Sequence, residues 1–245
     1  MLLQTMHPLI ALSLAPLLAA QGFYVRRTVP VLPEPPGPRH GTRGSGPSVR
    51  LLILGDSAAA GVGAVSQTEA LSGQLVAGLA ADRQVTWRLI ARSGYTTRGL
   101  LAHLREHPLE GEWDVAVISL GVNDAIRQHT PARFAADQRE LLAGLRARSG
   151  VRQRILSGLP PVHRFPALPE PLRWYLGSAA TQLDRTLASI AASESGCEYL
   201  SLNVPAELDV GAAMASDGFH PGPSAYALWG FAAAERIRRY PGLAR

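Results

Sequence analysis

Short hydrophobic runs recur along the chain, and most of them are followed by a turn and then by a stretch with helical periodicity. Apolar runs bounded by turn signals predict buried strands, whereas apolar positions three and four residues apart predict helices. The pattern predicts strands at 51–54, 84–91, 114–120, 154–158 and 198–202. It predicts helices at 97–107, 131–148, 172–193 and 224–239, and one that carries Leu71, Leu75, Val76 and Leu79 on one side. Strands that alternate with helices favour a parallel sheet. We therefore expect a three-layer α/β/α sandwich with a five-stranded parallel sheet.

The sequence also predicts the boundaries of several helices. Ser66 and Glu69 form a capping-box pattern ahead of the helix that carries Leu71. Thr130 followed by Pro131 is typical of a helix start. The segment from Leu159 to Gly177 is instead rich in proline, which predicts a long loop.

The first predicted strand ends in Gly55-Asp56-Ser57. Ligands of α/β sheets bind beyond the carboxyl ends of the strands, so Ser57 is a candidate nucleophile if a base can reach it. Asp217 and His220 offer a carboxylate and an imidazole three residues apart, near the other end of the chain. Each motif taken alone is also compatible with an ordinary turn.

Ser57, Gly94, Asn123 and His220, in this order and just past strands, resemble the four blocks of the SGNH hydrolases, the GDSL esterase/lipase family. The resemblance covers residues 50–240, and Ala58 departs from it because the family name implies leucine there. It implies a flavodoxin-like strand order and a carboxylic ester hydrolase that uses no metal or organic cofactor.

The chemistry expected from these residues is acyl transfer through a serine. Ser57 would attack the ester, His220 would take its proton, and Asp217 would orient the imidazole. The resemblance implies an oxyanion hole made of the backbone N–H groups of Ser57 and Gly94 and the side-chain amide of Asn123. Asp56 is interpreted as structural, bonding turn amides beside the nucleophile. His163 is the next candidate base.

Two other enzyme classes and one non-enzymatic class compete with this interpretation. His103, Glu106 and His107 match the H-x-x-E-H pattern of zinc peptidases, although a solvated helix end explains them as well. The α/β-hydrolases also use Ser, Asp and His in this order, but Ala59 stands where their G-x-S-x-G motif requires glycine. A membrane-tethered domain that keeps the fold and only binds a ligand is the third alternative.

Composition and charge add constraints on partners. The chain has no lysine, which excludes lysine chemistry, and its single Cys197 excludes an internal disulfide framework. Five arginines and one glutamate before Leu51 supply +4 of the formal net charge of +5. The rest is nearly neutral, which argues against a nucleic-acid-binding face.

The N-terminal region predicts membrane association. Residues 1–25 form an apolar anchor or signal segment, and residues 26–48 a basic, proline-rich linker to a hydrolase domain at 49–245. We expect a protein held at the membrane by its N-terminal helix and in contact with lipid there, or exported if that segment is a cleaved signal.

The substrate is expected to be a small-molecule ester, lipid-derived or with a small acyl group. Phe165, Trp174 and Tyr175 in the proline-rich segment would supply an apolar wall for an acyl chain. An O-acetyl-carbohydrate esterase or a thioesterase on the same fold is the alternative.

Overall fold

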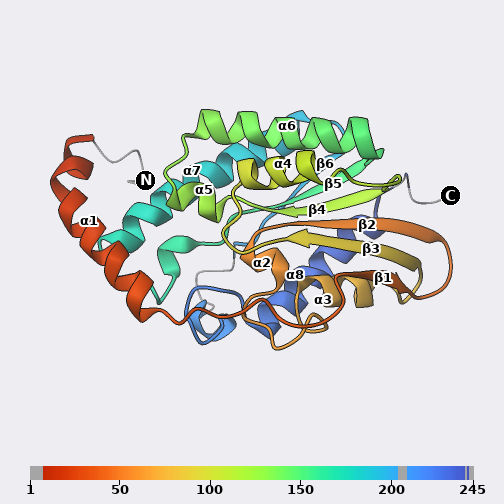
Figure 1. The fold of residues 1–245 in the computed structure, drawn as a ribbon, viewed down its shortest axis with the longest axis horizontal. Helices are drawn as coiled ribbons and strands as arrows, with labels where there is room; N and C mark the ends of the chain where they lie inside the picture. The colour runs from red at the N-terminus through yellow and green to blue at the C-terminus, as the bar shows by residue number, and fades with distance from the viewer. Residues whose placement is uncertain (1–7, 204–208, 241, 243–245) are drawn as a thin grey trace.

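A computed structural model describes residues 8–203, 209–240 and 242 of the chain (Figure 1). Its sheet has six strands in the order β1-β3-β2-β4-β5-β6 within these residues. The strands are β1 His40–Arg43, β2 Ser48–Gly55, β3 Gln84–Ala91, β4 Val115–Ser119, β5 Gln153–Ser157 and β6 Cys197–Leu200. Strands β2 to β6 pair in parallel, in the flavodoxin-like order. The predicted five-stranded parallel sheet is therefore present, with one further strand at its edge.

Strand β1 is the element that the sequence pattern did not predict. It pairs antiparallel with β3, placing His40 opposite Arg88 and Arg43 opposite Val85. Its four residues are mostly exposed and polar, so they show no hydrophobic alternation. The predicted linker at 26–48 thus contains a strand that covers the sheet edge, and its first three residues belong to the helix before it.

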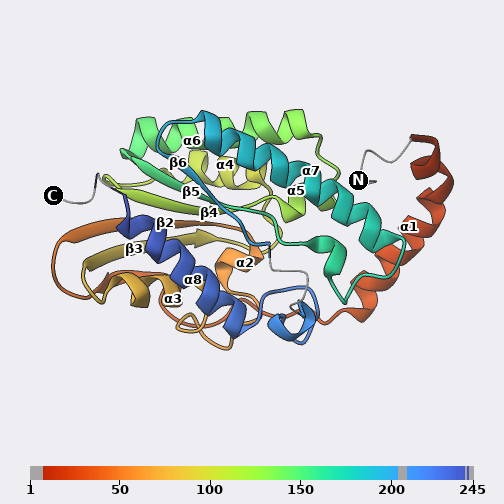
Figure 2. The same ribbon diagram turned by 180° about the vertical axis from the view of Figure 1, so that it is seen from behind.

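Helices cover both faces of the sheet (Figures 1 and 2). Helices α4 Thr97–Glu106, α5 Val122–Ile126, α6 Pro131–Ser149 and α7 Leu172–Ser193 lie on one face, and α2 Ser57–Ala60, α3 Leu71–Leu79 and α8 Pro223–Arg238 on the other. Strand β2 shows why. Leu52 and Leu54 pack into a first core, under α4, α6 and α7, while Leu51 and Ile53 pack into a second core, under α3 and α8. Successive side chains of a strand point to opposite faces, so a strand buried on both faces reads as a continuous apolar run.

The helix boundaries follow local capping, with one correction. The Thr130 hydroxyl accepts a hydrogen bond from Arg133 N–H, as expected at the start of α6. The capping box at Ser66 and Glu69 is wrong, because α3 begins only at Leu71 and no side chain caps it. Gln67 instead turns inward, where its amide donates to the Ala60 carbonyl at 2.8 Å.

Helix α1 Pro8–Thr28 packs beside the start of α7 (Figures 1 and 2). The Gln21 side chain joins the two, donating to the Glu170 carbonyl at 2.6 Å and accepting from Leu172 N–H at 3.0 Å. Among the residues that the structure describes, no helix has both the length and the hydropathy needed to cross a membrane. The predicted anchor also includes residues 1–7, which lie outside the described residues.

Tyr226 on α8 holds that helix against the segment after α2, because its hydroxyl donates to the buried Val62 carbonyl at 2.7 Å. Tyr226→Phe leaves that buried carbonyl without its donor, so we expect the free energy of unfolding to fall by about 1–2 kcal/mol. Urea denaturation measures it. Tyr24→Phe, at a side chain 60% exposed on α1, is the matched control and should change nothing. Equal effects of the two substitutions would contradict the assignment.

Candidate active site

Ser57 stands at the first position of helix α2, directly after strand β2. A side chain at Gly55 would come within 2.3 Å of the Ser119 carbonyl oxygen, so glycine is needed where the chain leaves the sheet. Asp56 caps α2, its carboxylate accepting a hydrogen bond from Ala58 N–H at 3.1 Å. The turn therefore holds Ser57 at the carboxyl edge of the sheet, and Asp56 has the structural role that the sequence predicted.

His220 and Asp217 lie beside Ser57, although they are far away in sequence. His220 Nε2 is 2.9 Å from Ser57 Oγ, and His220 Nδ1 is 2.6 Å from Asp217 Oδ2. Asp217 Oδ1 accepts from the backbone N–H groups of Phe219 and His220 at 3.0 and 2.9 Å. The structure thus joins the three predicted catalytic residues in one chain of hydrogen bonds.

Asp217 is kept ionised by its partners. Burial would raise the pKa of this carboxyl, but the hydrogen bonds from the His220 ring and from the two backbone N–H groups bring the pKa below its usual value. An ionised carboxylate on Nδ1 fixes the tautomer that leaves Nε2 free to accept the Ser57 proton. The electrostatics therefore suit a general base at Nε2.

The two other predicted oxyanion donors are placed differently. Asn123 lies on α5, and its amide donates to the Tyr95 carbonyl at 3.0 Å and points toward Asp56 Oδ2 at 3.5 Å. Gly94 lies in the turn between β3 and α4 with φ of 83°, a conformation that favours glycine. Gly94 is exposed and does not line the cavity beside Ser57, whereas Asn123 does.

Asp56 has an unusual protonation for a cap residue. Burial and, among the smaller effects, the nearby Asp124 carboxylate raise its pKa to about 7, against the hydrogen bond from Ala58 N–H. The carboxyl of the residue directly before the nucleophile therefore changes its charge near neutral pH.

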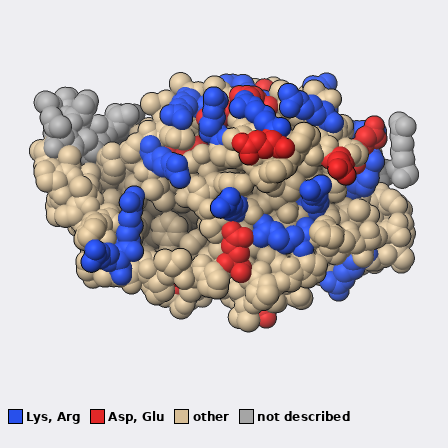
Figure 3. All heavy atoms as spheres, in the orientation of Figure 1, with Lys and Arg blue, Asp and Glu red and all other residues tan. Residues whose placement is uncertain are grey.

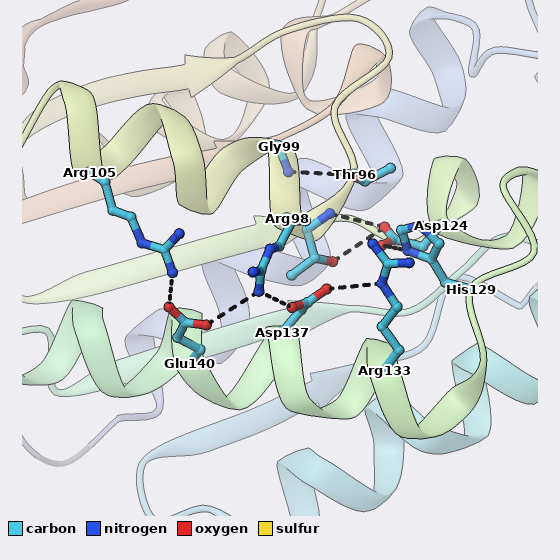
Figure 4. Close-up of polar contacts among 10 residues, drawn as sticks. Thr96, Arg98, Gly99, Arg105, Asp124, His129, Arg133, Asp137 and Glu140 are labelled. Atoms are coloured by element: carbon cyan, nitrogen blue, oxygen red, sulfur yellow. Dashed lines mark hydrogen bonds and ion pairs between the residues drawn. The ribbon is translucent and has the colours of Figure 1, made fainter.

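A buried polar network holds α5 in place (Figure 4). Asp124 is fully buried and accepts from Thr97 N–H at 3.1 Å and from the Thr97 hydroxyl at 3.3 Å. His129 Nδ1 is 2.9 Å from its other oxygen. Burial raises the pKa of Asp124 in spite of these hydrogen bonds. Because Asp124 follows Asn123 directly, this network fixes the position of the amide, a role that the sequence did not reveal.

Ion pairs between α4 and α6 surround this network. Arg98 contacts Asp137 at 3.0 Å, and Arg105 pairs with Glu140 (Figure 4). These side chains are largely exposed apart from Asp137, so the pairs contribute little individually. They keep α4, and with it Thr97, aligned against α6.

A cavity of about 610 Å³ opens beside Ser57 and His220. Most of its walls are apolar, and they come from α5, from the loops after β5 and β6, from the region before His220 and from one side of α8. They are Val122, Leu159, Pro160, Pro161, Phe165, Leu202, Val210, Ala213, Met214, Phe219, Ala225, Leu228, Trp229 and Ala232. Of the three aromatic residues predicted to form an acyl wall, Phe165 lines the cavity, but Trp174 and Tyr175 do not. The wall from α8 was missed, although its spacing at 225, 228, 229 and 232 is that of one helix face.

The remaining candidates lie away from this cavity. His163 is on the short 3₁₀ helix η1 Val162–Arg164 and does not line it. The rings of His103 and His107 pack together on α4, with centroids 4.7 Å apart. Within the described part of the chain, no three His, Cys, Asp or Glu side chains are grouped so that they could hold a metal ion.

The model of the GDSL-like lipase/acylhydrolase family matches residues 53–228, which include every predicted site residue. The chain belongs to this family. It is therefore a carboxylic ester hydrolase. Its order of Ser57, Gly94, Asn123 and His220 follows the blocks that the sequence suggested.

Individual relatives of this family member agree with the assignment. The GDSL-like esterase Rv1075c of Mycobacterium tuberculosis is 29% identical over 230 residues, covering 86% of this chain and 73% of the relative. An acetyl-xylooligosaccharide esterase of Geobacillus, Axe2, superposes with a TM-score of 0.59 at 22% identity, covering 82% of this chain and 98% of that one. An aryl esterase of M. smegmatis gives 0.58 at 21% identity, covering 78% and 98%. The two structures show that the fold is shared.

The raised pKa of Asp56 generates a prediction about stability. Because its pKa rises from 3.8 to about 7 on folding, the folded protein binds an extra proton between these values, and stability falls as pH rises through them. Asp56→Asn keeps an acceptor for Ala58 N–H and removes the titrating carboxyl. We therefore expect the free energy of unfolding to decline less steeply between pH 4 and pH 7 in this variant. Thermal unfolding across that range measures it. An unchanged slope, with Asp82→Asn as the exposed control, would contradict the prediction.

Proposed function

We propose that this family member hydrolyses carboxylic esters with an apolar acyl group through an acyl-Ser57 intermediate. The observation that carries the proposal is the chain of hydrogen bonds from Asp217 through His220 to Ser57, which opens onto the apolar cavity. This series of hydrogen bonds favours an enzyme over a binding domain, because a binding site has no need of a serine, an imidazole and a carboxylate in series.

In the first step Ser57 Oγ attacks the carbonyl carbon of the ester. His220 Nε2, 2.9 Å away, accepts the proton as the new C–O bond forms. The positive charge on the ring is then stabilised by Asp217, whose carboxylate stays ionised at neutral pH. The imidazolium returns this proton to the alcohol oxygen as the ester bond breaks, which leaves the acyl group on Ser57.

The developing oxyanion needs donors fixed in advance. We assign this role to the N–H of Ser57 at the start of α2 and to the Asn123 amide. One amide N–H is occupied by the Tyr95 carbonyl, whereas the 3.5 Å contact with Asp56 is too long to hold the other firmly. That second N–H is the one that we assign to the oxyanion. Gly94, the third expected donor, lies in an exposed turn that does not line the cavity.

In the second step water replaces the alcohol. His220 removes a proton from water, the hydroxide attacks the acyl carbon, and Ser57 Oγ leaves with the proton that His220 returns. The acid is released and the three residues regain their starting protonation. No cofactor enters either step.

The cavity favours an apolar acyl chain over an acetyl group on a sugar. Its lining along α8 extends from Ala225 to Ala232, roughly 10 Å of helix at 1.5 Å per residue. An acetyl group would leave most of this space empty, and the walls offer few polar groups for a carbohydrate. An acyl thioester would use the same groups, since only the leaving atom differs.

The acyl-serine mechanism makes a prediction about covalent labelling and turnover. A fluorophosphonate should label Ser57, and Ser57→Ala should abolish both labelling and ester hydrolysis, while Ser178→Ala on α7 leaves both intact. Asp217→Asn should lower kcat by roughly 10⁴, because the wrong tautomer of His220 is then stabilised. Mass spectrometry of the labelled protein and steady-state kinetics check these outcomes. Fluorophosphonate labelling that persists in Ser57→Ala would contradict the mechanism.

The acyl cavity makes a prediction about chain length. Ala225→Trp places a large side chain in the cavity at the start of the α8 wall, so we expect kcat/KM for a hexanoyl ester to fall about tenfold relative to an acetyl ester. Retained activity on the acetyl ester shows that the variant folds. Trp174→Ala is the control, since Trp174 lies outside the cavity and should leave the ratio unchanged. A ratio that responds to Trp174→Ala and ignores Ala225→Trp would place the acyl chain elsewhere.

A further inference from the structure

A second hollow lies between helix α4 and the edge formed by β3 and β1. This α4 groove has a volume of about 820 Å³ and includes six basic or potentially basic side chains: Arg39, His40, Arg88, Arg92, His103 and His107. Figure 3 shows arginine side chains gathered at the centre of this face, below the position of α4 in Figure 1. The mechanism proposed above uses none of these residues.

The strands direct their basic side chains into the groove. Leu89 and Ala91 of β3 belong to the core on the far face, so Arg88, Ile90 and Arg92 point toward α4. His40 of β1 is paired with Arg88 across the sheet, which places both on the same face.

Helix α4 supplies the opposite wall with one stripe of residues. Gly99, Ala102, His103, Glu106 and His107 are spaced three and four apart and all line the groove. The glycine and the alanine fill little space, so the sheet beneath stays uncovered. Next to them the His103 ring packs against Tyr95, with centroids 5.9 Å apart.

The charge in the groove is incompletely balanced. Its acidic side chains are Glu34 and Glu106. Glu34 is already satisfied, by Arg39 at 2.8 Å and by the Ser93 N–H and hydroxyl at 2.7 and 2.9 Å. Among the described residues, the only ion pair formed by an arginine of the groove is that between Arg39 and Glu34. The guanidinium groups of Arg88 and Arg92 are therefore available to bind an anion.

The pKa of His103 on α4 is affected by this charge. Burial lowers the pKa of His103, and the positive charges of His107, Arg92 and Arg88 lower it further, against the opposing effect of Glu106. An anion placed among these groups would relieve the repulsion.

The α4 groove adjoins the active site at the turn from Arg92 to Tyr95. Arg92 N–H donates to the Gly55 carbonyl at 3.3 Å, two residues before the nucleophile. The Tyr95 carbonyl accepts the Asn123 amide at 3.0 Å, while its ring lines the groove. The apolar cavity is bounded instead by the end of β4, by the loop after β5 and by α8. Ser57 therefore lines the apolar cavity, and the basic groove begins on the other side of the turn that neighbours it.

We infer that the α4 groove binds a phosphate group carried by the alcohol portion of the ester, while the acyl chain occupies the apolar cavity. The inference rests on the proposed function and extends it to the leaving group. Arginine forks from β3 and imidazoles from β1 and α4 approach from different sides, which suits the several oxygens of a phosphate better than the two of a carboxylate.

The test compares two butyryl esters that differ only in the alcohol, glycerol and glycerol phosphate. We expect a higher kcat/KM for the phosphorylated ester, and a preference that falls about tenfold in Arg88→Gln/Arg92→Gln and with added salt. Arg43→Gln, on the same edge but outside the groove, is the matched control and should keep the preference. A preference unchanged in the double variant would overturn the inference.

The same pair of esters with a dodecanoyl group separates two sources of the phosphate. If the preference for the phosphorylated ester grows with the longer acyl group, the phosphate belongs to a lipid. If the preference is confined to the butyryl pair, the phosphate belongs to a soluble ester.

A binding experiment separates failure of the groove from failure of the proposed function. Inorganic phosphate is titrated into the Ser57→Ala protein and followed by the NMR signals of His103 and His107. Shifts that disappear in the added Arg88→Gln/Arg92→Gln background support the groove even if no ester is turned over. Turnover of both butyryl esters with no such shifts would leave the esterase function standing and remove the phosphate site.

Discussion

The hydrogen bond from Ser57 to His220 joins residues 163 positions apart, and the arrangement of the rest of the fold is needed to form it. The nucleophile comes from the end of a central strand, whereas the base comes from the loop before the last helix. Two close contacts hold these segments together: Tyr226 bonds the Val62 carbonyl, and a side chain at Gly63 would come within 2.3 Å of the Pro221 carbonyl oxygen. The site therefore depends on the packing of α8 against the turn after β2.

The central strands and the long helices could be predicted because their burial leaves a simple pattern. Strand β3 and helix α7 have the predicted ends, since each is an apolar or periodic run bounded by turn residues. Strand β1 could not be found this way, because an exposed edge strand gains its stability from backbone pairing with β3 and shows no apolar alternation. The start of α3 was misplaced for a related reason: Gln67 bonds a distant carbonyl, and that tertiary contact prevails over the local capping pattern.

The site shows the same division. Ser57, Asp217, Asn123 and His220 were visible because short motifs after strands place reactive groups at one sheet edge. Asp124 was not distinguishable from a turn residue, since its role comes from burial against Thr97 and His129 and not from spacing. Trp174 was expected beside the substrate because it is aromatic and lies in a proline-rich segment. In the folded chain it is the first turn of α7 that carries it, away from the cavity.

The polarity on the two sides of Ser57 links the fold to specificity. On the side of β4 and β5, the strands are covered by α8 and by the loop after β5, and both present apolar side chains. On the side of β3, the stripe of helix α4 begins with a glycine and an alanine and continues with His103, and the edge strand β1 brings in a histidine beside Arg88. In the binding mode that we infer, an ester bound at Ser57 would meet both environments at once. The edge strand, which adds nothing to the chemistry of acyl transfer, would then contribute to the environment of the leaving group.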